Sequence, residues 1–268
     1  MKGGGRRPSG TPEERIRRAT EAWFITEPLL FGTFLTHRVV ARPAVSTLRS
    51  GEGRVEYNPA FIDALPDRVL EEVLRLEAVR IVLKHPYGRR PASGEIAYLA
   101  SNITLKEHVP TRLPLPSAAE VFGDAWLSRQ YYELYCDRLL DKKGGAGGGG
   151  GAELAAPEDP VGEHFDPARG AEITAMWQED SLAREQIDEV IRDVEASRSW
   201  GTLPGSLIAQ ILATLRPLLD YRKLYALLHS VDAVHQYANR VAHRIRLSGS
   251  LTNNLPRVVV KQIMIVGE

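Results

Sequence analysis

The hydrophobic periodicity of the stretch Val69–His85, VLEEVLRLEAVRIVLKH, is the main indication of the fold. At 100° per residue its apolar side chains fall on two adjacent stripes, and this spacing predicts a largely buried helix. Glu77 interrupts one stripe and Arg80 interrupts the other, three residues apart on one face. A buried acid and a buried base are costly unless they pair. The pattern therefore indicates either an interfacial ion pair or a face that looks into a functional site.

The segments around this helix carry both helical and strand-like patterns. Ser50–Gly53 lies between two runs with strand character, which is typical of a hairpin. Proline residues and first-turn acids mark several helix starts. These patterns predict an α+β fold that is mainly helical, with a small β-hairpin sheet. We expect helices over residues 12–25, 29–40, 66–85, 94–107, 118–122 and 127–140, and strands over 44–49 and 54–57.

Two changes in composition divide the chain. Residues 1–12 are rich in Gly, Pro and Arg, and we expect a disordered arm there. Residues 142–170 contain a run of glycine, which predicts a flexible Gly-rich linker. The linker would separate a unit over residues 13–141 from a helical connector over 171–268. Within the connector we expect helices over 171–198, 207–215 and 221–245 and a strand over 258–266.

The composition excludes several classes of protein. The 268 residues include 34 Lys or Arg and 34 Asp or Glu, and this balance argues against a dedicated nucleic-acid binder. The single cysteine, Cys136, cannot form an internal disulfide. No stretch approaches the roughly 20 apolar residues that span a bilayer, and the N-terminus lacks the apolar core of a signal peptide. We expect a cytoplasmic protein that does not associate with membranes.

Three segments lie where a known family has its motifs, although none of these motifs is intact. Leu76–Arg80 lies where that family has His-Glu-x-x-His, and Glu56–Pro59 resembles the strand that precedes it. Ala100–Lys106 lies where the family has Ala-x-Asp-x-x-x-Asn. On these motifs the chain resembles the bacterial putative metallopeptidase domain found upstream of von Willebrand factor A-type domains. The resemblance implies a zincin-like N-terminal domain, and it implies that the C-terminal strand begins a truncated A-type domain.

The resemblance also implies where a metal site would lie. In His-Glu-x-x-His the histidines bind zinc and the glutamate is the general base. Leu76 and Arg80 stand at the histidine positions, Asn102 at the third ligand position and Glu77 at the position of the base. Leucine has no donor atom, and arginine stays protonated and repels a cation. We therefore expect a degenerate site without metal or other cofactor, in which Arg80 pairs with Glu77 close to Asn102.

Other residues are assigned weaker roles or none. The resemblance also covers His85 and Lys106, which match the family at its later histidine and in its second motif. His108 and His164 fall in expected loops without cysteine partners, and we assign them no metal.

These features predict a non-catalytic scaffold or binding module. The resemblance implies a MoxR-type AAA ATPase as its partner. One alternative is an active zinc-dependent hydrolase with unconventional ligands. Another is a nucleic-acid-associated protein that uses its basic C-terminal tail, because residues 216–261 hold eight Lys or Arg and two Asp.

Overall fold

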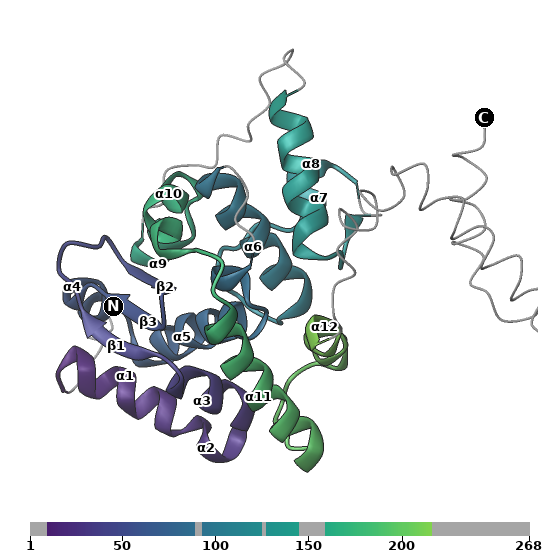
Figure 1. Ribbon diagram of the computed structural model, residues 1–268. Coiled ribbons are helices and arrows are strands. Elements are labelled where there is room, and N and C mark those ends of the chain that lie inside the picture. The colour runs from purple at the N-terminus through teal and green to yellow at the C-terminus, as the bar shows by residue number, and fades with distance from the viewer. Residues whose placement is uncertain (1–9, 89–92, 125–126, 145–158, 216–268) are drawn as a thin grey trace, which may run out of the picture. The chain divides into compact units, whose positions relative to one another are not determined.

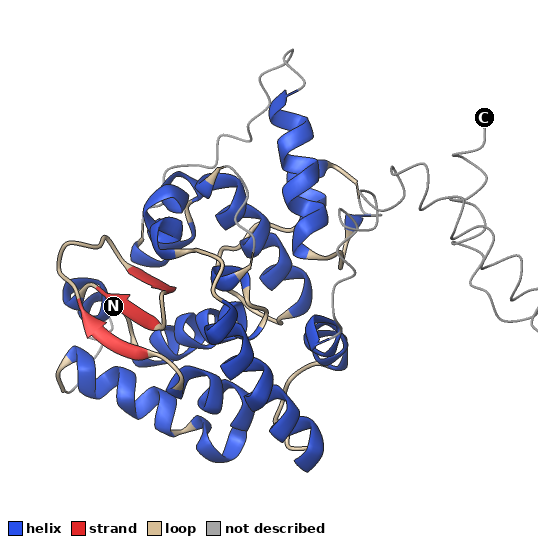
Figure 2. Cartoon of the chain, in the orientation of Figure 1, coloured by secondary structure: helices blue, strands red, loops and turns tan. Residues whose placement is uncertain are grey.

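A computed structural model describes residues 10–88, 93–124, 127–144 and 159–215. The chain divides into two units, Met1–Arg216 and Pro217–Glu268, and the second lies outside the described residues. The first unit is mainly helical with one small sheet, as Figures 1 and 2 show, so the expected α+β class is confirmed. The longer helices are α1 (Pro12–Glu21), α3 (Pro28–Leu35), α5 (Asp67–Val82), α6 (Gly94–His108), α8 (Tyr132–Gly144), α11 (Ser181–Ser197) and α12 (Gly205–Leu215). The shorter helices are α2 (Trp23–Thr26), α4 (Pro59–Ala64), α7 (Ala118–Phe122), α9 (Pro160–Phe165) and α10 (Gly170–Ile173), with 3-10 turns η1 (His85–Tyr87), η3 (Pro167–Arg169) and η4 (Thr174–Met176).

The sheet has three strands in the order β1-β3-β2. The hairpin strands β2 (Leu48–Gly51) and β3 (Arg54–Tyr57) pair in an antiparallel ladder, as the turn signal predicts. The expected helix over 29–40 is wrong at its end, because α3 stops at Leu35 and β1 (Arg38–Ala41) pairs parallel to β3. The β-branched Val39 and Val40 favour an extended chain once β3 offers an edge.

Helix α5 forms the centre of the larger hydrophobic core. Ten of its 16 residues are buried, and α1 and α3 pack against it. Arg15 of α1 fixes the start of α5: its guanidinium donates to the carbonyls of Ile62 and Leu65 at 2.6 and 2.5 Å. The same guanidinium pairs with Asp67 at 2.8 Å. These contacts secure α4, which the sequence patterns do not predict, against the first helix of the chain.

A second hydrophobic cluster surrounds α6. Helices α8 and α10 pack on α6, and the buried side chains of Tyr135, Cys136 and Trp177 belong to this cluster. Helix α8 begins at Tyr132, five residues later than expected, and continues to Gly144. Helices α5 and α6, which belong to different clusters, are in contact with each other.

The expected flexible linker over 142–170 is wrong for residues 142–144 and 159–170. Residues 142–144 form the end of α8. Residues 159–170 contain α9 and η3 and lead into α10. Asp159 caps α9 and Pro160 begins it, and both His164 and Phe165 are buried. The expected helix over 171–198 is also wrong, since it breaks at η4 and resumes as α11 at Ser181. The amide of Gln178 donates to the carbonyl of Pro86 in this break.

Some expectations lie outside the described residues. They are the disordered arm over residues 1–9, the glycine run itself, the helix over 221–245 and the strand over 258–266. The remainder of the expected arm belongs to α1, because Thr11 caps that helix and Pro12 begins it. The limits of the expected domains stay a prediction. No described helix is long and apolar enough to cross a membrane.

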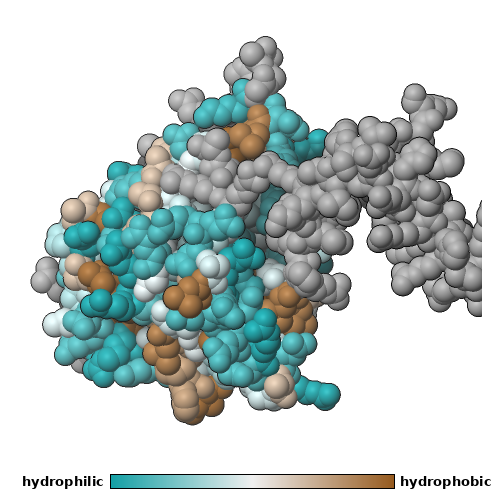
Figure 3. Space-filling view, in the orientation of Figure 1, coloured by the Kyte–Doolittle hydropathy of each residue, from teal (hydrophilic) through white to brown (hydrophobic). Residues whose placement is uncertain are grey.

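The face in Figure 3 is largely hydrophilic, with brown residues gathered at its lower edge. Figure 1 places α2 at that edge, and α2 exposes Phe24 and Ile25. The ring of Phe24 lies edge-on against Phe31 of α3, 5.4 Å between centroids.

Two glycines of the hairpin provide a matched test of this packing. Both have positive φ, but a Cβ on Gly51 would lie 2.4 Å from the Met176 carbonyl oxygen, whereas one on Gly53 would meet nothing within 4 Å. Gly53→Ala should cost about 1 kcal/mol of unfolding free energy through backbone strain alone. Gly51→Ala should cost at least about 2 kcal/mol more, because η4 must move and because the φ of 150° at Gly51 is harder for alanine to adopt than the φ of 66° at Gly53. Urea denaturation measures both, and equal losses would contradict the close approach of β2 and η4.

Candidate functional site

The centre of the candidate site is an ion pair between two side chains of α5. Arg80 Nε donates to Glu77 Oε1 at 2.9 Å, and both side chains are 0% exposed. The residues lie three apart, so one helix face presents both of them. The Arg80 guanidinium also lies 4.9 Å from the ring centroid of Tyr98 and 5.9 Å from that of Trp177. These aromatic faces enclose the cation and attract it.

Helix α6 supplies the remaining acceptors for Arg80. One terminal nitrogen donates to the Ser101 hydroxyl, and the other donates to Asn102 Oδ1 at 2.8 Å. Ser101 and Asn102 are both fully buried. Every nitrogen of the guanidinium therefore has an acceptor. The expected pairing of Arg80 with Glu77, close to Asn102, is confirmed.

Glu77 accepts a hydrogen bond from β2 and makes an electrostatic contact with α9. The Ser50 hydroxyl of β2 donates to Glu77 Oε2 at 3.1 Å. His164 Nε2 of α9 lies 3.6 Å from Glu77 Oε1, which is an electrostatic contact longer than a hydrogen bond. Burial raises the pKa of the Glu77 carboxyl, but the Arg80 guanidinium and, less strongly, the His164 ring outweigh it and lower this pKa to about 2. Glu77 is therefore ionised at neutral pH and fully engaged in pairing.

His164 is the main residue that the sequence analysis missed. It lies in α9, where a loop is expected, and its side chain is 0% exposed. Its Nδ1 is 3.0 Å from the Thr47 hydroxyl, and its Nε2 has no hydrogen-bond partner among the described residues. The available signal is local: Asp159 and Pro160 read as a helix start, and the apolar Phe165 follows the histidine.

Helix α6 also binds the backbone of α9. The Tyr98 hydroxyl donates to the His164 carbonyl at 2.5 Å, and Asn102 Nδ2 donates to the Phe165 carbonyl at 3.3 Å. Asn102 thus uses its oxygen for Arg80 and its nitrogen for α9. The Asn102 amide therefore joins the ion pair to the end of α9.

His85 belongs to the cluster through a serine. It lies in η1, beyond the end of α5, and its Nδ1 is 2.7 Å from Ser101 Oγ. Its ring stacks on Tyr132 with centroids 4.4 Å apart. Burial, and next the positive charge of Arg80, hold the pKa of His85 well below its ordinary value. A neutral imidazole therefore lies beside the cation.

The other expected site residues lie apart from this cluster. Leu76 packs in the larger hydrophobic core, and the Lys106 amine donates to the Thr111 carbonyl at 3.4 Å. His108, expected in a loop, is the last residue of α6.

The residues present do not fit the zinc ion that the motif resemblance implies. The three ligand positions hold the apolar Leu76, the cationic Arg80 and the amide of Asn102. The Arg80 guanidinium itself fills the space between Glu77 and Asn102. Among the described residues there is no group of three or more His, Cys, Asp or Glu that could hold a metal ion. The structure therefore supports no reaction step through a metal at this position.

The ionised state of Glu77 predicts a specific pH dependence of stability. Its folded pKa of about 2 lies below its ordinary value of 4.5, so its contribution is complete above about pH 4.5 and is lost as pH falls towards 2. The Glu77→Gln variant should be less stable than wild type at pH 7, and the gap should narrow steadily below pH 4.5. Urea denaturation across this range measures the gap. The exposed Glu21→Gln is the control and should change stability by less than about 0.5 kcal/mol throughout. A gap that widens as pH falls would contradict the pairing.

Comparison with known proteins gives one match. A family model described as "Putative metallopeptidase domain" matches residues 11–244, which is most of the chain. No curated protein and no solved structure matches it. The family match includes both motif segments, Leu76–Arg80 and Ala100–Lys106, and also the α9 residue His164. The chain belongs to the "Putative metallopeptidase domain" family.

Proposed function

We propose that this protein is a non-catalytic member of its family that acts as a scaffold or binding module. The observation that carries the proposal is the enclosed guanidinium of Arg80, whose nitrogens donate to Glu77, Ser101 and Asn102. An arginine cannot lose its proton or bind a metal cation at any physiological pH. The position of the second histidine in the motif therefore carries a fixed positive charge in place of a metal ligand.

The surroundings of Glu77 support the same proposal. A general base must reach a water molecule and a substrate. The Glu77 side chain is 0% exposed, and Arg80, Ser50 and His164 surround its two oxygens. A carboxylate with a pKa of about 2 is also a weak base at neutral pH. Glu77 is therefore placed to stabilise Arg80 rather than to activate water.

The partner and the cellular location belong to the proposal as well. The family resemblance points to a MoxR-type AAA ATPase as the protein with which such a module works, in the cytoplasm. A binding module needs a rigid body, and the buried cluster supplies one by linking β2, α5, α6 and α9. Co-purification of the full chain with such an ATPase is the direct check on the partner.

Metal content tests the non-catalytic proposal. The wild-type chain, produced with added zinc and analysed by inductively coupled plasma mass spectrometry, should hold far less than one zinc per chain and should not cleave a casein substrate. Leu76→His, Arg80→His and Asn102→Asp together restore the donor set of the family motif and should raise zinc affinity strongly.

The control carries the same histidine spacing on an exposed helix face. Arg17→His with Glu21→His on α1 gives an i,i+4 pair without further ligands, and this variant measures the weak chelation that any helix provides. The triple variant should bind zinc more tightly than this control. One zinc per wild-type chain, lost on Glu77→Gln or His164→Ala, would instead support the active zinc hydrolase.

A further inference from the structure

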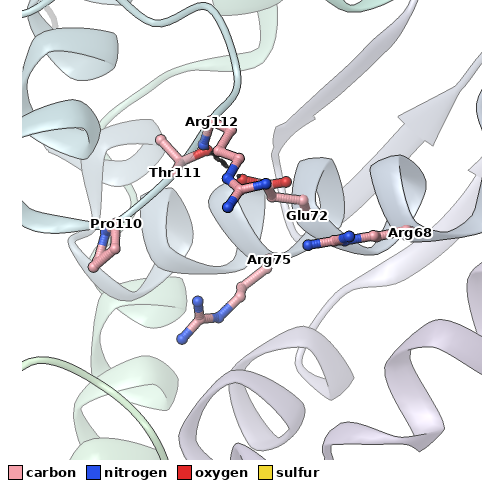
Figure 4. Close-up of a pocket in the computed structure, with 6 residues that line it drawn as sticks. All are labelled: Arg68, Glu72, Arg75, Pro110, Thr111 and Arg112. Atoms are coloured by element: carbon pink, nitrogen blue, oxygen red, sulfur yellow. Dashed lines mark hydrogen bonds between the residues drawn. The ribbon is translucent and has the colours of Figure 1, made fainter.

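A surface pocket of about 510 Å³ lies between α5 and the loop that follows α6. Figure 4 shows side chains from both elements around it, with Glu72 between Arg68 and Arg112 and with the Arg75 guanidinium pointing away from Glu72. No residue of the buried Glu77–Arg80 cluster lines it. The lining residues are Arg68, Glu72, Arg75, Pro110, Thr111 and Arg112.

The helix side of the pocket follows from residue spacing. Arg68, Glu72 and Arg75 stand at i, i+4 and i+7 of α5, so they share one face. Glu72 holds the loop in place: the Thr111 hydroxyl and the Arg112 amide both donate to its Oε1, at 2.5 and 3.1 Å. Proline residues further restrict this loop. The pocket is therefore preformed by contacts that do not use the arginine side chains at positions 68 and 112.

The arginines of the pocket differ in how far their charge is compensated. Arg75 pairs with Glu27 at 2.8 Å and also donates to the Thr202 hydroxyl. Neither Arg68 nor Arg112 forms an ion pair within the described part of the chain, and both are exposed. Glu72 is the acid in the lining. The pocket thus presents two uncompensated guanidinium groups to solvent in a chain whose total charge is balanced.

We infer that this pocket binds an acidic peptide segment of a protein partner, through carboxylates that pair with Arg68 and Arg112. Guanidinium groups match carboxylates in a bidentate geometry. The inference rests on the proposed binding function and names the surface and the chemistry of the partner.

Two features favour a peptide over a phosphate or a nucleotide. Arginine side chains bind phosphate as well as carboxylate, but many phosphate sites also use free backbone N–H groups at helix N-termini or glycine loops. Here the Arg112 amide is already bonded to Glu72, and Pro110 has no amide hydrogen. In addition, the Glu72 carboxylate lies between the arginines, as Figure 4 shows, and would repel a compact polyanion. An extended peptide can place separate carboxylates on either side of it.

Fluorescence anisotropy with the full chain tests the pocket. The probe is a fluorescein-labelled hexaglutamate peptide, with hexaglutamine as the neutral comparison. Hexaglutamate should bind saturably and lose affinity as salt increases, whereas hexaglutamine should not bind. Arg68→Ala with Arg112→Ala should weaken binding at least about tenfold.

The matched control removes the same charge elsewhere. Arg38→Ala with Arg138→Ala takes away two exposed arginines outside the pocket, and it should change affinity less than about twofold. Thermal melting of both double variants checks that they fold like wild type.

Three results would overturn the inference. The first is that hexaglutamate does not bind, and the second is that both double variants lose hexaglutamate affinity equally. The third is that inorganic phosphate, ATP or a single-stranded oligonucleotide binds more tightly than hexaglutamate and depends on Arg68 and Arg112. Zinc content is measured on the same preparations. If hexaglutamate does not bind, the measured zinc content still tests the proposed function. If one zinc is found per chain, the proposed function is refuted, but the peptide affinity still tests the pocket.

Discussion

The buried ion pair between Glu77 and Arg80 is the constraint on which the rest of the structure depends. Removing two charges from water is costly, and the cost is recovered only when every donor and acceptor finds a partner. In this protein the partners come from four different elements: β2, α5, α6 and α9. The side chains that meet here are therefore fixed in their positions by the requirement that the charges stay satisfied.

This requirement also explains how a segment after the glycine run becomes part of the domain. Asn102 and Tyr98 each donate to a backbone carbonyl of α9, and His164 faces Glu77. The Thr47 hydroxyl lies 3.0 Å from the other ring nitrogen, Nδ1. Hydrogen bonds from Asn102 to the α9 backbone and from Arg80 to Asn102 therefore hold this segment against α6.

The parts of the fold that could be predicted are those with a strong local signal. The 3.6-residue period of α5 and the i,i+3 spacing of Glu77 and Arg80 are local, and the hairpin follows from its glycines. The approach of Asn102 to Arg80 was accessible because the family's motifs place those positions together. His164 was missed because the glycine run dominates the composition of residues 142–170, so the whole segment was assigned to a linker and the short capped helix α9 within it was not recognised. Strand β1 was missed because its apolar residues continue those of α3, and only pairing with β3 separates them.

The structure predicts strong energetic coupling between Glu77 and Arg80, and a double-mutant cycle measures that coupling directly. The cycle compares the unfolding free energies of Glu77→Gln, Arg80→Met and the combination, with Glu21→Gln and Arg17→Met as the exposed pair on α1. Each single change in the buried pair leaves a partner unsatisfied, so the coupling should be at least about 2 kcal/mol, against less than about 0.5 kcal/mol for the exposed pair. A coupling between Glu77 and Arg80 as small as that of the exposed pair would contradict the account.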